Sequence, residues 1–69
     1  MKITFDKNAD AVYIELSDKD FSKNKKIDDS TIIDLDTNGD IIGIELLDVS
    51  KRLTTDVLSN ITVENIASI

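Results

Sequence analysis

The stretch TIIDLDTNGDIIGIELL, residues 31–47, decides the fold. Apolar and polar residues alternate in its two flanks, 31–36 and 41–47, with a period of two. Such alternation is typical of a β-strand with one buried face. Asn38-Gly39 between the flanks is the strongest short hairpin signal, because a type I′ turn needs positive φ at both central residues. The stretch therefore predicts a hairpin with three cross-strand pairs: Leu35 with Ile42, Ile33 with Ile44, and Thr31 with Leu46.

A second hairpin is predicted upstream, where residues 2–6 and 11–17 alternate in the same way around a turn at residues 7–10. Pairing Asp6 with Ala11 places Phe5 opposite Val12 and Ile3 opposite Ile14. The apolar side chains then share one face, and a slip of one residue would destroy that match. The register is therefore well specified by the sequence.

The remaining segments carry weaker signals. We expect residues 18–30 to be a charged connector with a short edge strand near Lys25–Asp28, whose lysines block edge-to-edge association. Beyond residue 48, apolar residues recur every four positions, which predicts a short helix that Thr54 or Thr55 caps and that ends near Asn60. The tail, residues 61–69, fits a short helix or a strand. The predicted fold class is α+β: a small antiparallel sheet built from two hairpins, with one or two short C-terminal helices.

Composition sets limits on the chemistry. With 69 residues the chain is expected to form a single domain, 1–69, which buries only about 60% of its unfolded surface. It has no cysteine and no histidine, which excludes disulfides, thiolate zinc sites and a histidine base. We expect no cofactor. No apolar leader or membrane-length segment is present in the sequence, so we expect a cytoplasmic protein.

The net charge of −6 is unevenly distributed, because residues 27–50 contain seven acidic residues and no basic one. A nucleic-acid-binding protein needs a basic face to neutralise phosphates, and this chain lacks one. We expect no nucleic acid and no membrane as a partner. A cation or a basic protein fits this charge better.

Residues 34–45 match the EF-hand calcium loop, in which Asp34, Asp36, Asn38 and Glu45 would supply the oxygen ligands. An EF-hand needs helices on both sides of the loop, whereas both flanks here alternate as strands. In the predicted hairpin Glu45 lies beside Ile32, far from the turn. We therefore predict no metal site, and retain these four residues as the candidates should one exist.

Asp34 and Asp36 also fall on one strand face, about 7 Å apart at Cα. Glycosidases use paired carboxylates at separations of that order. Such enzymes also need a deep cleft that desolvates one carboxylate, which a chain of this size rarely builds. We therefore expect Asp34 and Asp36 to be solvated, and the protein not to be an enzyme.

Two segments resemble a known family. Asp10-Ala-Val-Tyr-Ile-Glu-Leu-Ser17 is similar to its "aDalYi.Ls" segment, and residues 33–50 are similar to its "DyDedGnivGIEildaS" signature. This is the YuzE-like group of small prokaryotic proteins, a domain of unknown function (2283), and the resemblance covers residues 1–53. It implies a small α+β domain with an antiparallel sheet, defines no catalytic residue, and suggests an antitoxin-like role by association with toxin-like genes.

The functional prediction is a protein-interaction module that forms a homodimer. One short helix cannot cover all the apolar surface that the sequence predicts. This surface comprises one apolar sheet face, apolar residues among acids on the other face, and an apolar tail that includes Ile61, Val63, Ile66 and Ile69. The alternative is a carboxylate-based protein that binds divalent cations. A small enzyme is the third alternative.

Overall fold

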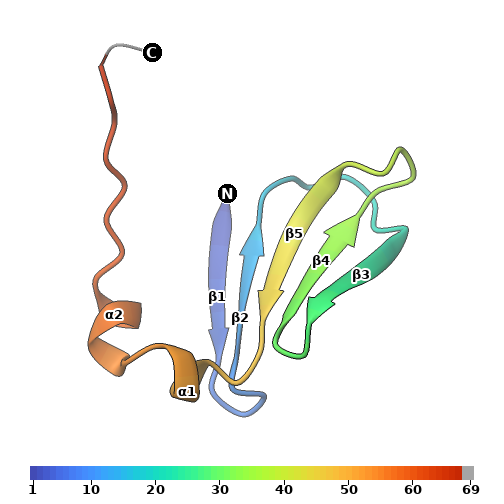
Figure 1. The fold of residues 1–69 in the computed structure, drawn as a ribbon. Helices are drawn as coiled ribbons and strands as arrows, with labels where there is room; N and C mark the ends of the chain where they lie inside the picture. The colour runs from blue at the N-terminus through green and yellow to red at the C-terminus, as the bar shows by residue number, and fades with distance from the viewer. Residues whose placement is uncertain (68–69) are drawn as a thin grey trace.

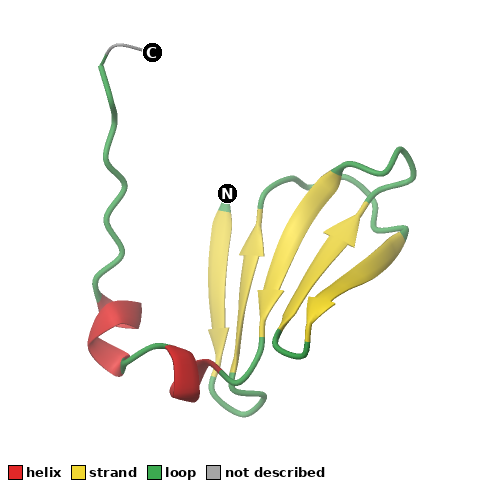
Figure 2. Cartoon of the chain, in the orientation of Figure 1, coloured by secondary structure: helices red, strands yellow, loops and turns green. Residues whose placement is uncertain are grey.

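The computed structural model describes residues 1–67, which form a five-stranded antiparallel sheet, two short helices and an extended tail (Figures 1 and 2). This architecture confirms the predicted α+β class. The strands are β1 (Lys2–Asp6), β2 (Ala11–Glu15), β3 (Lys23–Asp28), β4 (Thr31–Leu35) and β5 (Ile41–Leu46), and the helices are α1 (Val49–Arg52) and α2 (Thr55–Ser59). None of the described helices is long and apolar enough to cross a membrane.

The strand order in the sheet is β1-β2-β5-β4-β3. The connection after β2 carries the chain to the far edge, and β3, β4 and β5 then return strand by strand until β5 pairs with β2 (Figure 1). The first hairpin has the predicted register, with Phe5 opposite Val12 and Ile3 opposite Ile14. The two predicted hairpins therefore lie in one continuous sheet.

The second hairpin differs from prediction near its turn. Ile33 pairs with Ile44 and Thr31 with Leu46 as expected, but Leu35 pairs with Ile41 rather than with Ile42. A bulge at this point leaves Ile42 as an extra residue, and its carbonyl oxygen accepts the N–H groups of Leu16 (2.9 Å) and Ser17 (3.2 Å). The bulge thereby extends the pairing between β5 and the end of β2.

The turn itself explains this shift. Among the described residues, positive φ occurs at Gly39 (83°) and at two aspartates, but not at Asn38, so the predicted type I′ turn is wrong. The Gly39 N–H donates to the Asp36 carbonyl (3.1 Å), and the Asp36 N–H donates to the Asp40 carbonyl (3.0 Å). This wider loop, closed between Asp36 and Asp40, displaces the register by one residue.

The expected edge strand is present as β3, longer than predicted and exposed along its whole length. Two short C-terminal helices are present, within the predicted one or two, and they are separate because Leu53 between them is extended (φ −130°, ψ 147°). Thr54 caps α2 as predicted, since its hydroxyl oxygen accepts the Val57 N–H (3.3 Å). Residues 60–66 form neither the helix nor the strand that the sequence allowed, and Ile69 lies outside the described residues.

Cross-strand pairing produces a row of four isoleucines across four strands: Ile3, Ile14, Ile44 and Ile33. α1 lies near the lower end of the sheet and α2 beside the lower half of β1, and the tail runs apart from the strands (Figure 1). Ile3 consequently remains 41% exposed, and the apolar residues buried among those described are Val12, Ile42 and Val49. The molecule is a thin slab, 37 × 36 × 18 Å, with a single sheet layer.

Gly39→Val should lower the free energy of unfolding by more than about 1 kcal/mol. Nothing lies within 4 Å of a Cβ built at Gly39, so the cost comes from backbone strain at φ 83° and not from a collision. Gly39→Asn is the matched control and should cost less, because asparagine tolerates the left-handed conformation. Urea midpoints measure both effects, and an unchanged midpoint for Gly39→Val would mean that the turn is wrongly placed.

Candidate functional site

The sheet face opposite the isoleucine row brings polar side chains of four strands together. Two neighbouring rows cross this face: Thr4, Tyr13, Glu45 and Ile32 in one, and Glu15, Gly43 and Asp34 in the other. Tyr13 and Glu45 are direct cross-strand partners, and Asp34 is diagonal to Glu45, within reach of a long side chain. Pairing of β2 with β5 therefore assembles a cluster from residues that are far apart in the sequence.

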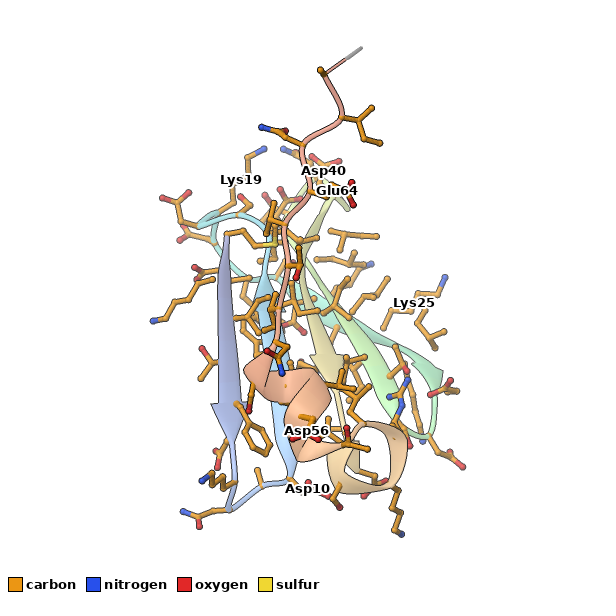
Figure 3. All side chains as sticks on the ribbon, turned by 90° about the vertical axis from the view of Figure 1, so that its left-hand side faces the viewer. Asp10, Lys19, Lys25, Asp40, Asp56 and Glu64 are labelled. Carbon is orange, nitrogen blue, oxygen red and sulfur yellow. The ribbon has the colours of Figure 1, made fainter. Side chains whose placement is uncertain are left out.

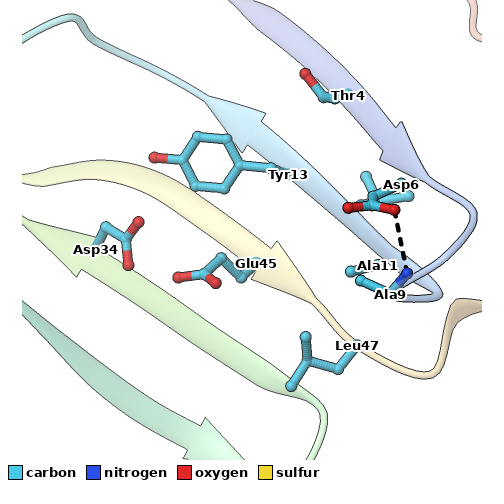
Figure 4. A pocket seen from close by; sticks show the side chains of 9 residues that line it. Thr4, Asp6, Ala9, Ala11, Tyr13, Asp34, Glu45 and Leu47 are labelled. Atoms are coloured by element: carbon cyan, nitrogen blue, oxygen red, sulfur yellow. Dashed lines mark hydrogen bonds between the residues drawn. The ribbon is translucent and has the colours of Figure 1, made fainter.

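Gly43 makes room for the aromatic ring in this cluster. A Cβ built at Gly43 would collide with the hydroxyl group and the ring of Tyr13. The Tyr13 ring therefore lies over Gly43 of β5. Its hydroxyl group points to the same side as Asp34 (Figure 4). A glycine within a strand often marks such a close approach.

The cluster borders an open hollow of about 500 Å³ between β1, β2, β4 and β5, which we call the carboxyl hollow. Tyr13, Asp34 and Glu45 line it, with Thr4 and Leu47 on either side (Figure 4). Asp34 is only 8% exposed, and within residues 1–67 its Oδ1 atom has no hydrogen-bond partner. The expectation of a solvated Asp34 is therefore wrong, because Tyr13 and neighbouring strands exclude water from it.

The three polar groups of the carboxyl hollow perturb one another. Hydrogen bonding to the Asp34 carboxyl group, then burial, then repulsion by the Asp34 charge raise the pKa of Glu45. Burial, followed by the charge of Asp34 and hydrogen bonding to it, raises the pKa of Tyr13. Both shifts favour the protonated form, because each group lies beside the acidic Asp34 carboxyl group.

Asp36 is also buried, at 3% exposure, so the expectation that it is solvated is wrong as well. Its Oδ1 atom accepts the N–H groups of Asn38 and Asp40, both at 2.9 Å, and thereby holds the turn. Its Oδ2 atom has no partner among the described residues. Asp36 is thus a turn-forming residue, which is a common role for aspartate.

The four candidate metal ligands are divided between two places. Asp36 and Asn38 belong to the turn, whereas Asp34 and Glu45 lie on the sheet, where Glu45 is paired with Ile32 as predicted. Within residues 1–67, no three acidic side chains come close enough together to hold a metal ion. The structure does not assemble the EF-hand ligand set.

Other polar residues of the two family-like segments stabilise the fold. The Asp10 carbonyl accepts the Val49 N–H (3.1 Å), and the Asp10 carboxylate accepts both the N–H (3.1 Å) and the hydroxyl (2.7 Å) of Ser50. Asp10 thereby supplies the N-terminal cap of α1 from the β1–β2 turn, at the end of the sheet (Figure 3). Arg52 donates to the Ser30 carbonyl (2.7 Å) and ties the same helix to the β3–β4 turn.

A family model described as "Protein of unknown function (DUF2283)" matches residues 2–50. The chain belongs to this family. No curated protein and no solved structure matches it. The matched region contains all five strands and the Asp10–Ser50 contact, whereas α2 and the tail lie beyond it. The family segment therefore coincides with the sheet, and the carboxyl hollow lies within the family segment.

Sequence reasoning named Asp34 and Glu45, and the hairpin places Gly43 opposite Asp34, but it missed Tyr13 as their neighbour. Each hairpin was predicted separately, and no local signal shows that β2 pairs with β5. A glycine within the alternating run 41–47 was the available signal, because it leaves space that a large side chain on the next strand can fill.

Glu45→Gln should stabilise the protein by about 0.5 kcal/mol at neutral pH, because it removes one of two adjacent acidic groups. The raised pKa of Glu45 means that the native state binds its proton more tightly than the unfolded state does. Stability of the natural protein should therefore decrease as pH rises from the ordinary glutamate value of 4.5 through the raised one. Urea midpoints across this range test the sign.

The control for net charge is Glu64→Gln on the exposed tail, which should shift the midpoint little at any pH. The advantage of Glu45→Gln should disappear below pH 4.5. An advantage that persists in acid would show that the glutamine packs better and that repulsion is not the cause.

Calcium at millimolar concentration should raise the melting temperature by no more than about 2 °C, because a real site would stabilise the native state by RT ln(1 + [L]/Kd). Thermal denaturation with calcium, and with magnesium for comparison, measures this. A large, saturable increase that Glu45→Gln abolishes would restore the EF-hand interpretation of residues 34–45.

Proposed function

We propose that the protein is an interaction module that self-associates into a homodimer through its apolar sheet face. The isoleucine row and the neighbouring Phe5, which is 40% exposed, carry this proposal. A sheet with one apolar face is stable when a second layer covers that face. The described helices supply only part of such a layer, because Val12 of this face and Val49 of α1 are buried whereas Ile3 and Phe5 remain 41% and 40% exposed.

The surface area supports the same proposal. A compact monomer of 7.7 kDa is expected to expose about 4,300 Å². The accessible surface of the chain is 5539 Å², an excess of about 1,200 Å². Each partner in a standard interface buries about 800 Å². The uncovered sheet and the extended tail thus expose enough surface for a stable dimer.

Contact through the face is favoured over contact through a sheet edge. The outer strand β3 carries Lys23, Lys25 and Lys26, and all of its residues are exposed. Lysines along an edge disfavour the addition of another strand. A second copy that packs its own apolar face against this one gives a two-fold arrangement, the commonest form of homodimer.

We propose binding and not catalysis as the activity. The chain contains no histidine or cysteine. The carboxyl hollow is open, whereas substrate pockets usually enclose most of the surface of their ligand. Its polar groups suit the recognition of a ligand.

Sedimentation equilibrium from micromolar to hundreds of micromolar protein tests the dimer. We expect a mass of twice 7.7 kDa in the natural protein, and Phe5→Glu should shift it toward 7.7 kDa by placing a charge in the apolar face. The matched control is Thr4→Glu, the adjacent residue of β1, whose side chain is on the opposite face. Circular dichroism should show an unchanged sheet in both variants.

A 7.7 kDa monomer at every concentration in the natural protein would overturn the proposal. Equal loss of association in the Phe5→Glu and Thr4→Glu variants would also contradict it, because added charge and not the apolar face would then be the cause.

A further inference from the structure

We propose that the carboxyl hollow binds an alkylguanidinium group, the group carried by an arginine side chain, between Asp34, Glu45 and Tyr13. The proposal concerns the face opposite the one assigned to self-association, so the hollow stays accessible in the dimer proposed above.

An unused acceptor is the first observation that points to a ligand. Asp34 is more than nine-tenths buried, lines the carboxyl hollow, and has an Oδ1 atom without a hydrogen-bond partner in residues 1–67. Buried polar atoms in native proteins almost always have a partner. A donor from outside the chain would complete this site.

The charge of the hollow specifies a cationic donor. Asp34 and Glu45 are diagonal neighbours, and among the described residues no lysine or arginine lines the hollow. Lys26, which continues the row beyond Ile32, does not line the hollow, and its Nζ atom lies 3.2 Å from Asp29. A bound cation would replace the repulsion between the two carboxyl groups by attraction to both.

The arrangement suits a planar organic cation better than a metal ion. Calcium takes six to eight oxygen ligands, whereas only two carboxyl groups converge here. Asp6, the third acid on the rim, uses its Oδ1 atom to accept the N–H groups of Asn8 (2.9 Å) and Ala9 (3.1 Å). A guanidinium group has five N–H donors in a fixed plane and can bond to two carboxyl groups at once.

The aromatic ring and the apolar rim add to this fit. Tyr13 borders the hollow and offers a ring on which a guanidinium plane can stack. Ala11 and Leu47 lie on the rim, where they can contact the methylene groups of an arginine side chain. The hollow thus combines carboxyl groups for the guanidinium with apolar side chains for the alkyl chain of an alkylguanidinium.

The fluorescence of Tyr13 provides a direct test, because the chain has one tyrosine and no tryptophan. Nα-acetylarginine amide should change the emission saturably, with half-saturation in the millimolar range. The citrulline analogue, which has the same shape without the charge, should have no effect. Amide NMR shifts that follow the same titration should be largest at Tyr13, Gly43 and Glu45.

Asp34→Asn should weaken the binding of Nα-acetylarginine amide at least tenfold, and Glu45→Gln at least threefold. Asp40→Asn, which removes an exposed carboxylate outside the hollow, should leave binding unchanged. Gly43→Ala should also abolish binding by displacing the Tyr13 ring. If Asp34→Asn does not fold, as judged by circular dichroism, the Glu45→Gln and Asp40→Asn pair decides.

The absence of a saturable response to Nα-acetylarginine amide would overturn the proposal, and so would an equal response to the citrulline analogue. Saturable binding of calcium that displaces the arginine derivative would assign the hollow to a metal instead. A short peptide with a central arginine distinguishes the two sources of the group: tighter binding than the free derivative indicates a protein partner, and equal binding indicates a small molecule. Repeating the titration on Phe5→Glu separates this result from the outcome of the dimer test.

Discussion

Pairing of β2 with β5 joins the two-stranded unit β1–β2 to the three-stranded unit β3–β4–β5. An isolated hairpin is at best marginally stable in water, and a third strand or a packed helix is needed for independent stability. The same pairing places Ile14 beside Ile44 on one face and Tyr13 beside Glu45 on the other. Both the apolar row and the carboxyl hollow therefore depend on this one contact between strands.

Five of the 14 acidic residues form two physical groups. Asp10, Asp28 and Asp36 accept backbone N–H groups and thereby build turns or cap a helix. For Asp28, the hydrogen bond from the Ser30 N–H is the main cause of a lowered pKa. Asp34 and Glu45 hold no turn, and they lie side by side as diagonal neighbours in the carboxyl hollow. The negative charge is thus partly structural and partly available for recognition.

Local patterns in the sequence predict most of this fold. Alternation gives the strands, the register of the first hairpin and two pairs of the second, and the Thr54 cap gives the start of α2. The bulge at Ile42 is not predictable in this way, because it depends on the Asp36 carboxylate holding a wider loop than Asn38-Gly39 suggests. The interruption at Leu53 is likewise invisible to a count of apolar spacing.

The candidate site is harder to predict from the sequence than the fold is. The carboxylates attract attention because they match an EF-hand pattern, yet that pattern groups Asp34 with Asp36 and Asn38, which the structure assigns to a turn. The partners of Asp34 are Tyr13 of β2 and Glu45 of β5. Strands β3 and β4 separate these two strands in the sequence. The hairpin already places Glu45 near Asp34, but only the strand order shows that Tyr13 joins them.

That strand order also constrains the sequence of events during synthesis. The β1–β2 hairpin leaves the ribosome first, but its neighbour in the sheet is the last strand to be made. Until Leu46 has emerged, β2 has no partner on its inner edge, and the apolar residues of the hairpin stay exposed to water. The chain must therefore complete the sheet after translation of β5, so the slow, long-range closure comes at the end of folding.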